Sequence, residues 1–309
     1  MSELNNKIDF ALVFTATKAN PNGDPLDGNR PRTDIDGYGE VSDVCLKRKI
    51  RNRLLDMGER IFVQSDDRRA KDDNYRSLYD RAIGCTEFKA AIDAKNRAET
   101  ERIACKTWFD VRTFGQIFMS SSSKKASKKK NADEEVESKE NSGSVSIGIR
   151  GPVSIQMALS ADPVLISTMQ ITKSVNLETD SENPDKKSTD TMGTKCFVDF
   201  GVYTTFGSIN VKQAEKTGFS EEDAEKLKEA LRTLFVNDET AARPSGSMEV
   251  VKLVWWKHNN EIGQYSPAKV HKLLKVTKKD GVAEPRSMDD YDITIDELDG
   301  LAYEDVKIN

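Results

Sequence analysis

Hydrophobic and β-branched residues recur along the 309-residue chain in runs that predict several β-strands. Four such runs, separated by turn-rich segments, lie at 8–16, 146–159, 197–206 and 250–258. The segment 107–119 has the same composition and is predicted to be a further strand. Pro152 favours an edge position or a bulge in its run, because proline has no backbone N–H to donate.

Helical periodicity predicts two helices that pack on these strands. In the segment 42–57 one stripe is apolar, and Ser42 and Gly58 are suitable caps at its two ends. The stripe consists of Leu46, Ile50, Leu54 and Met57. In the segment 220–236 a second stripe follows Ser220 and Asp223, which have the spacing of a capping box.

Long polar segments interrupt this framework. Residues 59–107 are charged and mostly helical in pattern, with few apolar anchors, which indicates an insertion rather than a core. Residues 120–143 are of low complexity, first lysine-rich and then acidic, and are expected to form a mobile loop. Residues 168–194 are polar and turn-rich, and the tail 284–309 is acidic.

Without these segments the order is strand, helix, strand, strand, strand, helix, strand. This order predicts an α+β fold in which both helices cover one face of an antiparallel sheet. A ferredoxin-like or RRM-like sheet satisfies it. The whole chain, 1–309, is therefore expected to be a single domain with insertions.

Composition excludes several classes of protein. The two histidines, His258 and His271, do not have a zinc-ligand spacing, and the four cysteines form no CxxC pair. The sequence lacks a run of about 18 apolar residues, an N-terminal signal segment and the phosphate-loop and nucleophile-elbow motifs. We expect a cytoplasmic protein without membrane contact, and neither a metal nor another cofactor.

The net charge of −5 argues at first against a nucleic-acid partner. From Glu284 to Asn309, however, nine acidic and two basic residues give −7, so that residues 1–283 carry −5 + 7 = +2. The segment 47–53 alone holds five cations and no acidic residue. The local positive charge is therefore compatible with nucleic-acid binding, although the net charge of the whole chain is negative.

Several motifs, in order, identify a family resemblance. They are Asn20-Pro-Asn-Gly-Asp-Pro25, Gly28-Asn-Arg-Pro-Arg32, Asp43-Val-Cys-Leu-Lys-Arg-Lys-Ile-Arg-Asn52, Phe109-Asp-Val-Arg-Thr-Phe-Gly-Gln116 and Arg243-Pro-Ser-Gly246. The chain resembles, over essentially its whole length, the backbone subunit of the type I-C CRISPR Cascade surveillance complex. The loop 120–143 looks like a local addition to the family pattern.

The resemblance implies an RRM-like palm, a finger insertion at 59–107 and a thumb-like β-hairpin at 168–195. It also implies that copies form a homo-oligomeric helical filament along a CRISPR guide RNA (crRNA) and kink it, so that its bases pair with target DNA in antiviral defence. Other Cascade subunits, namely the end-capping, large and small subunits, are the further partners. The resemblance implies no enzymatic activity and no catalytic residue.

The basic segment 47–53 is the first candidate RNA contact. Its cations repel one another unless they meet phosphates, and a guide of any sequence must be bound through its backbone. The candidates are Lys47, Arg48, Lys49 and Arg51. A merely solvated helix face is the alternative interpretation.

Further RNA contacts are expected from loops and from the run 107–119. The loop 20–32 offers Asn20, Asn22, Arg30 and Arg32, unless it is only a connector. On a strand, Arg112, Phe114 and Gln116 share one face that suits bases or sugars, although Phe114 is also a core candidate. Arg150, Arg243 and Ser245 complete the set, with surface ion pairs as the alternative for the two arginines.

The expected thumb at 168–195 has its own candidate residues. Met169, Thr172, Lys173, Met192 and Lys195 are the expected contacts for kinking the RNA. A polar hairpin with a few apolar residues needs another surface to pack on, and a disordered loop is the alternative.

Asp24, Asp34 and Asp36 follow the first strand and raise a rival function. Related backbone subunits of another CRISPR class resemble metal-dependent ribonucleases with an essential aspartate, and carboxylates can hold Mg²⁺. Asp24, however, lies in a common turn sequence. A metal-dependent ribonuclease on the same scaffold is the alternative function, and a protein-interaction scaffold without RNA is a third.

Overall fold

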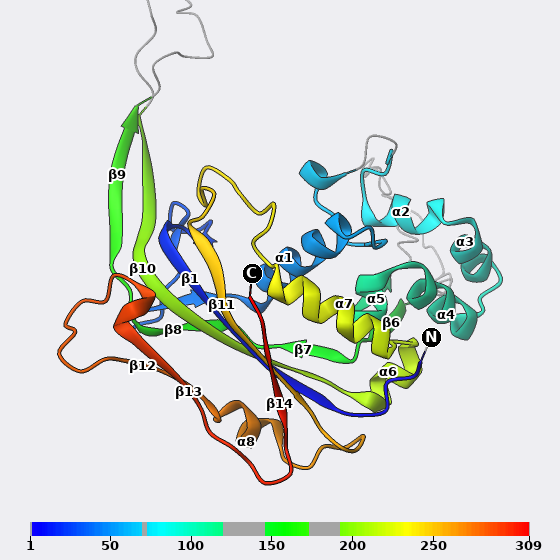
Figure 1. Ribbon diagram of the computed structural model, residues 1–309. Coiled ribbons are helices and arrows are strands. Elements are labelled where there is room, and N and C mark those ends of the chain that lie inside the picture. The colour runs from blue at the N-terminus through cyan, green and yellow to red at the C-terminus, as the bar shows by residue number, and fades with distance from the viewer. Residues whose placement is uncertain (1, 70–72, 120–145, 173–191, 309) are drawn as a thin grey trace, which may run out of the picture.

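The computed structural model describes residues 2–69, 73–119, 146–172 and 192–308, and a large antiparallel sheet runs through them (Figure 1). Within these residues the sheet has eight strands. Six of them follow the order β14 (Tyr303–Val306), β11 (Met248–Lys257), β1 (Ile8–Ala19), β10 (Met192–Ile209), β8 (Ala158–Pro163) and β4 (Tyr38–Val41). The other two, β7 (Val153–Ile155) and β9 (Ile166–Thr172), also pair with β10.

Smaller elements surround this sheet. Three two-stranded sheets are β2 (Gly23–Asp24) with β3 (Arg30–Pro31), β5 (Gly115–Met119) with β6 (Ser146–Arg150), and β12 (Leu274–Lys278) with β13 (Tyr291–Ile295). The helices are α1 (Asp43–Asp56), α2 (Leu78–Gly84), α3 (Thr86–Asp93), α4 (Arg97–Thr107), α5 (Phe109–Phe114), α6 (Val211–Thr217), α7 (Glu221–Arg232) and α8 (Pro267–His271), with short 3₁₀ turns at Asp66–Arg68 and Met288–Asp290. The acidic segment 284–309 thus contributes two strands, β13 and β14.

Both faces of the central strand β1 are buried, which explains its nearly continuous hydrophobic sequence. Phe10, Leu12 and Phe14 face a core shared with α1 and α7. Ala11 and Val13 face a second cluster shared with α8, β12 and β13. The sheet is therefore the middle layer of the molecule (Figure 1).

The capping residues of both predicted helices are confirmed. Ser42 Oγ accepts a hydrogen bond from Cys45 N at 3.2 Å at the start of α1. At its end the N–H groups of Gly58 and Glu59 donate to Leu55 O and Leu54 O, the pattern of a Schellman motif, and Gly58 has a φ of 90°. Ser220 and Asp223 form the capping box that opens α7.

The prediction of a strand over 107–119 is wrong for most of its length. α4 ends at Thr107, α5 occupies Phe109–Phe114, and only Gly115–Met119 is a strand. Phe109 and Val111 each bury their side chains in a different hydrophobic cluster, and this packing outweighs β propensity. Arg112, Phe114 and Gln116 therefore do not share a strand face.

The predicted strand 146–159 is three strands, β6, β7 and β8, with a first break at Gly151 and Pro152. Proline removes a backbone donor at this break, as the sequence indicated. Gly151 is packed closely, because a Cβ there would lie 2.3 Å from Thr113 O. The break lets β6 leave the large sheet and pair with β5.

The helical segment 59–107 has a hydrophobic core that the sequence analysis underestimated. Phe62, Phe88, Trp108 and Phe118 pack at ring-centroid distances between 4.8 and 6.2 Å. Ala82 of α2 and Ile103 of α4 complete the cluster with Ile147 of β6. The helices α2–α4 and the β5–β6 ribbon therefore form one packed unit beside the sheet (Figure 1).

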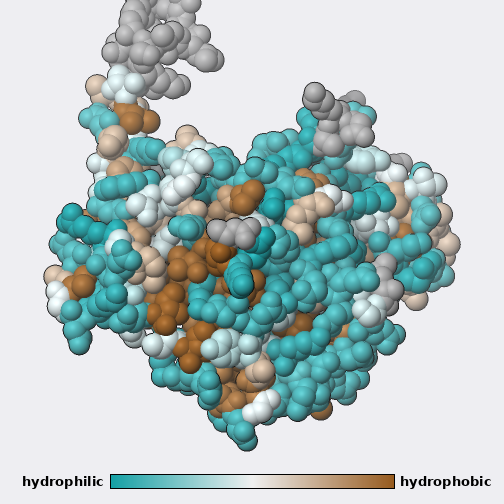
Figure 2. Space-filling model, in the orientation of Figure 1, coloured by the Kyte–Doolittle hydropathy of each residue, from teal (hydrophilic) through white to brown (hydrophobic). Residues whose placement is uncertain are grey.

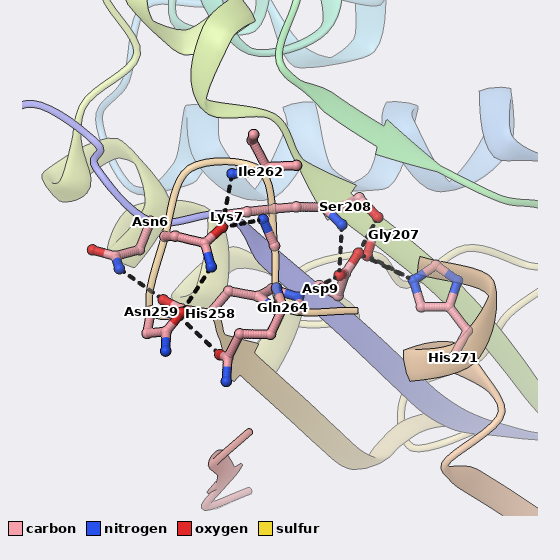
Figure 3. A network of polar contacts seen from close by, with 12 residues as sticks. Asn6, Lys7, Asp9, Gly207, Ser208, His258, Asn259, Ile262, Gln264 and His271 are labelled. Carbon is pink, nitrogen blue, oxygen red and sulfur yellow. Dashed lines mark hydrogen bonds and ion pairs between the residues drawn. The ribbon is translucent and has the colours of Figure 1, made fainter. Parts of the chain in front are cut away.

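The two histidines meet at Asp9, which is far from both of them in sequence (Figure 3). His258 Nε2 lies 2.8 Å from Asp9 Oδ2, and Gln264 N donates to His258 Nδ1 at 3.0 Å, so that Nε2 carries the proton. His271 Nε2 lies 3.5 Å from Asp9 Oδ1. Burial alone would raise the pKa of Asp9, but hydrogen bonds from His258, His271 and Ser208 and the charge of Lys7 hold it well below its usual range.

The left-handed backbone at Gly115 generates the first testable prediction. Its φ is 81°, and a Cβ there would lie 2.2 Å from Ile149 O, whereas Gly148 on the paired strand has open space. Gly115→Ala is expected to lower the free energy of unfolding by about 2–4 kcal/mol through strain and overpacking. Gly148→Ala is the matched control and should change it by less than about 1 kcal/mol. Equal denaturant midpoints for the two variants would contradict this role of Gly115.

Candidate nucleic-acid interface

Two cations of α1, Lys49 and Arg51, have acidic partners from distant parts of the chain, which offset the expected self-repulsion of the segment 47–53. Lys49 is buried in an ion pair with Asp238, and burial lowers its pKa although Asp238 opposes the shift. Arg51 Nε donates to Asp110 Oδ2 at 3.0 Å. The premise that this cluster lacks acidic partners was wrong, because a local segment does not reveal charges that the fold brings to it.

Asp110 and Asp223 are the two almost fully buried carboxylates of this region. Asp110 also accepts hydrogen bonds from Phe62 N at 2.7 Å and Val63 N at 3.1 Å, and thereby fixes the start of the helical unit. Arg112 donates two hydrogen bonds to the Asp223 carboxylate, from Nε at 3.0 Å and from Nη2 at 2.8 Å, which makes the contact bidentate. Arg51 and Arg112 therefore position α1, α5 and α7 relative to one another, and Lys49 is buried away from any ligand.

Lys47 and Arg48 remain available at the surface of α1. Lys47 Nζ lies 3.1 Å from Asp43 Oδ2 within the same helix. The nearest contact between Arg48 and Asp67 is 3.6 Å, and both side chains are more than 60% exposed. Such an exposed pair contributes little to stability and exchanges readily for a phosphate.

The loop 20–32 is held in place by the amides that were expected to face a ligand. Asn22 Oδ1 accepts hydrogen bonds from Ser42 N at 2.9 Å and Ser42 Oγ at 3.0 Å. Asn20 is 4% exposed and donates through Nδ2 to Asn29 O at 2.6 Å. These two amides are structural, and Arg30 is the exposed cation of the loop.

The loop 238–247 joins this surface from the other end of the sequence. Asn20 N donates to Ala242 O at 2.9 Å, which places the two loops side by side. Arg243 Nε lies 3.0 Å from Asp238 Oδ2, the carboxylate that also holds Lys49. Ser245 is exposed at the tip of this loop. The structure thus brings together three of the predicted regions.

Phe114, Gln116 and Arg150 lie near one another along the backbone of the β5–β6 ribbon, although Arg112, Phe114 and Gln116 were expected on one strand face. Gly115 pairs with Arg150 and Gln116 with Ile149 in the β5–β6 ribbon. Phe114 is partly buried, and its ring lies 6.0 Å from Lys47 Nζ and 5.1 Å from Arg51 Cζ. Arg150 is exposed beside this group.

The strands β9 and β10 form a hairpin that projects from the sheet (Figure 1). Lys195 is opposite Met169, and Met192 is opposite Thr172. Met169 and Met192 are 52% and 66% exposed, which is unusual for large apolar side chains. Lys173 and the loop 120–143 lie outside the described residues.

Two of the three carboxylates of the rival ribonuclease function, those of Asp24 and Asp34, are engaged in turns. Asp24 Oδ1 accepts from Leu26 N at 3.0 Å and from Arg32 Nη2 at 3.2 Å. Asp34 Oδ1 accepts from Asp36 N at 3.0 Å and Tyr38 N at 2.8 Å. Among the residues that the structure describes, histidine, cysteine and acidic side chains form no group of three that could hold a metal.

Three aspartates that pair with cations of α1 and α5 were not predicted from the sequence, namely Asp110, Asp223 and Asp238. Asp110 lies in the apolar run Trp108-Phe-Asp-Val111, and an isolated charge in such a run signals a buried partner. Asp223 was identified as a helix cap but not as an ion-pair partner. Asp238 had no comparable local signal, because its contact with Lys49 spans 189 positions.

These features define a mixed α/β protein with a large antiparallel sheet and a projecting hairpin (Figure 1). Arg30, Arg48 and Arg150 are exposed, and the face seen in Figure 2 is mostly hydrophilic with scattered hydrophobic patches. The chain belongs to the CRISPR-associated protein Cas7 family, whose model matches residues 6–296. It is similar to the CRISPR-associated protein Cas7 of Haloferax volcanii, with 26% identity over 301 residues, 95% of this chain and 82% of that protein.

Two solved structures share lower similarity. One, described as a CRISPR RNA-guided surveillance complex, pre-nicking, has a TM-score of 0.41 and 14% identity over 81% of this chain and 78% of that chain. The other, a CRISPR RNA-guided surveillance complex, has a TM-score of 0.38 and 15% identity over 81% and 68%. Both TM-scores are too low to support an argument about function. No helix in the described ranges is long and apolar enough to cross a membrane.

The contrast between buried and exposed arginines gives a stability prediction. Arg51→Ala leaves the almost fully buried Asp110 without its cation and is expected to cost about 3 kcal/mol of unfolding free energy. Arg48→Ala on the same helix removes only an exposed pair and should cost less than about 1 kcal/mol. Urea unfolding of both variants measures the difference. A loss for Arg48→Ala as large as that for Arg51→Ala would show that exposure does not separate the two roles.

Proposed function

We propose that this protein is the non-catalytic, guide-RNA-binding subunit that forms the backbone of a type I-C CRISPR surveillance complex. Membership of the CRISPR-associated protein Cas7 family over residues 6–296 carries the proposal. In this function, copies polymerise along the guide RNA in the cytoplasm and present its bases for pairing with target DNA. End-capping, large and small subunits complete the complex.

Strand order supports an RRM-like palm. The central strands follow the order β11, β1, β10 and β8. α1 follows β1, and α7 lies between β10 and β11, with both helices packed in the same core. This is the βαββαβ arrangement of a ferredoxin-like sheet. The α2–α4 unit within 59–107 would then be the finger, and the hairpin within 168–195 the thumb.

Exposed cations supply the RNA-backbone contacts in this proposal. Arg30, Arg48 and Arg150 face solvent. Lys47 and Arg32 have partly exposed partners that a phosphate can replace, and the partly exposed Arg243 lies beside Asp238 at the edge of the same surface. Contacts of this kind neutralise phosphates and carry no sequence information, as a subunit that binds any guide requires.

The projecting hairpin supports the kinking role. Exposed Met169 and Met192 are flexible apolar side chains at its free part. Apolar side chains inserted between bases unstack them and kink a nucleic acid. Lys195 would meet the neighbouring phosphates.

Binding measurements test the RNA surface. Arg48→Glu combined with Arg150→Glu is expected to weaken binding to guides of unrelated sequence about equally, and to flatten the slope of log affinity against log salt by roughly two units. Lys272→Glu, an exposed change at the end of α8 on the opposite face of the sheet, is the control and should bind normally. A loss confined to some guide sequences would indicate base recognition instead.

A nuclease assay tests the absence of catalysis. Labelled guide and complementary RNA incubated with the purified assembly and Mg²⁺ should remain intact, because Asp24 and Asp34 are committed to turn hydrogen bonds. Gel electrophoresis over several hours measures this. Cleavage that Asp24→Ala or Asp34→Ala abolishes would establish the ribonuclease alternative.

A further inference from the structure

We propose that the turn carrying Ile35 on one copy of the chain docks into the apolar cavity of the helical unit on a second copy. This inference rests on the proposed self-assembly and names the surfaces that make one of its contacts. Three observations support it: a cavity, an exposed side chain on a rigid turn, and the charges around both.

The cavity lies between α2, α3 and the β5–β6 ribbon and has a volume of about 420 Å³. Its floor is aromatic, with Phe62, Phe88 and Phe118 all buried. At its mouth Tyr79 and Ile117 are 54% and 64% exposed. Large apolar side chains left in water around a cavity are characteristic of an interaction site.

Ile35 has the most exposed of the large hydrophobic side chains in the described residues, at 99%. Its turn is rigid, because Asp34 Oδ1 accepts two backbone hydrogen bonds and Asp34 N donates to Tyr38 O at 2.9 Å. A side chain displayed on a fixed backbone loses little entropy when it binds. Ile35 therefore suits insertion into a cavity of another molecule better than packing within its own chain.

The charges beside Ile35 and around the cavity are complementary. Asp36 follows Ile35, is exposed, and forms no ion pair within the described part of the chain. Lys89, Lys95 and Arg97 line the cavity together with a single acidic residue, Asp93. Arg97 is paired with Glu101 at 2.8 Å, so the net positive charge of the rim comes from Lys89 and Lys95. An aliphatic side chain beside an aspartate therefore complements an apolar cavity with a net positive rim.

Position favours a second copy of the chain as the occupant. The Ile35 turn is tied to the base of the projecting hairpin, because Val164 N donates to Gly37 O at 2.9 Å. The hairpin and the helices α2–α4 lie at opposite sides of the molecule (Figure 1). A contact between two different patches at opposite ends is heterologous and repeats from copy to copy, as a filament requires.

Ile262 provides a matched control within the same chain. It is 80% exposed on a turn held by Asn260 Oδ1, and it also has an acidic neighbour, Glu261. Unlike Asp36, Glu261 is already paired, with Lys212 at 2.7 Å. Ile262→Ser therefore makes the same side-chain change in a turn whose acidic neighbour is already in an ion pair.

The experiment compares the full-length variants bound to guide RNA by sedimentation or mass photometry. Ile35→Ser and Ile117→Ser should each raise the protein concentration needed for multi-copy assembly about 10- to 100-fold, since each removes an apolar side chain from the contact. The double variant should lose little more than either single variant, because both act on one contact. Ile262→Ser should assemble normally.

Separate readouts distinguish this inference from the proposed function. RNA binding by single copies at low protein concentration, measured by fluorescence anisotropy, should be unchanged in Ile35→Ser. If RNA binding is intact and Ile35→Ser assembles as the parent protein does, or loses no more than Ile262→Ser, the docking contact is wrong. Loss of a different subunit from the complex with self-assembly retained would also overturn it, since the occupant would not be a second copy.

Discussion

The arrangement of the helices and of the basic side chains depends on three carboxylates, those of Asp110, Asp223 and Asp238. Each receives a cation from α1 or α5, and each lies at a junction between helices or loops. Charges removed from water must be paired, and breaking such a pair leaves an expensive buried charge. The pairs therefore connect α1 with α5 and with the loop 238–247, and α5 with α7, and they occupy three of the basic side chains.

This constraint divides the basic residues into two groups with different roles. Lys49, Arg51 and Arg112 are inside and hold elements together. Arg30, Arg48 and Arg150 are outside, on the surface that the inner pairs orient. In the proposed function a polyanion would exchange on the outer group without a change in the fold, because exposed pairs are weak. The inner group stabilises the fold, and the outer group is the one available for ligands.

Local signals were sufficient for much of the fold. Ser42, Gly58 and the Ser220–Asp223 box marked helix ends correctly, because caps satisfy backbone groups within a few residues. The prediction of a strand over 107–119 was wrong for most of its length. Phe109 and Val111 are buried in different hydrophobic clusters, and a short helix accommodates both. A hydrophobic run of this length does not distinguish a strand from a buried helix.

Local patterns and ordered motifs in the sequence were enough to predict most of the strands and helices, the turn-rich loops and the resemblance to a CRISPR-associated family. The tertiary structure alone decided which cations are exposed, that Asn20 and Asn22 shape their loop, and that His258 and His271 meet at Asp9. The physical reason is distance: charge pairing and burial act between residues that are close in space, and the partners of Lys49 and Asp9 lie 189 and 249 positions away along the chain.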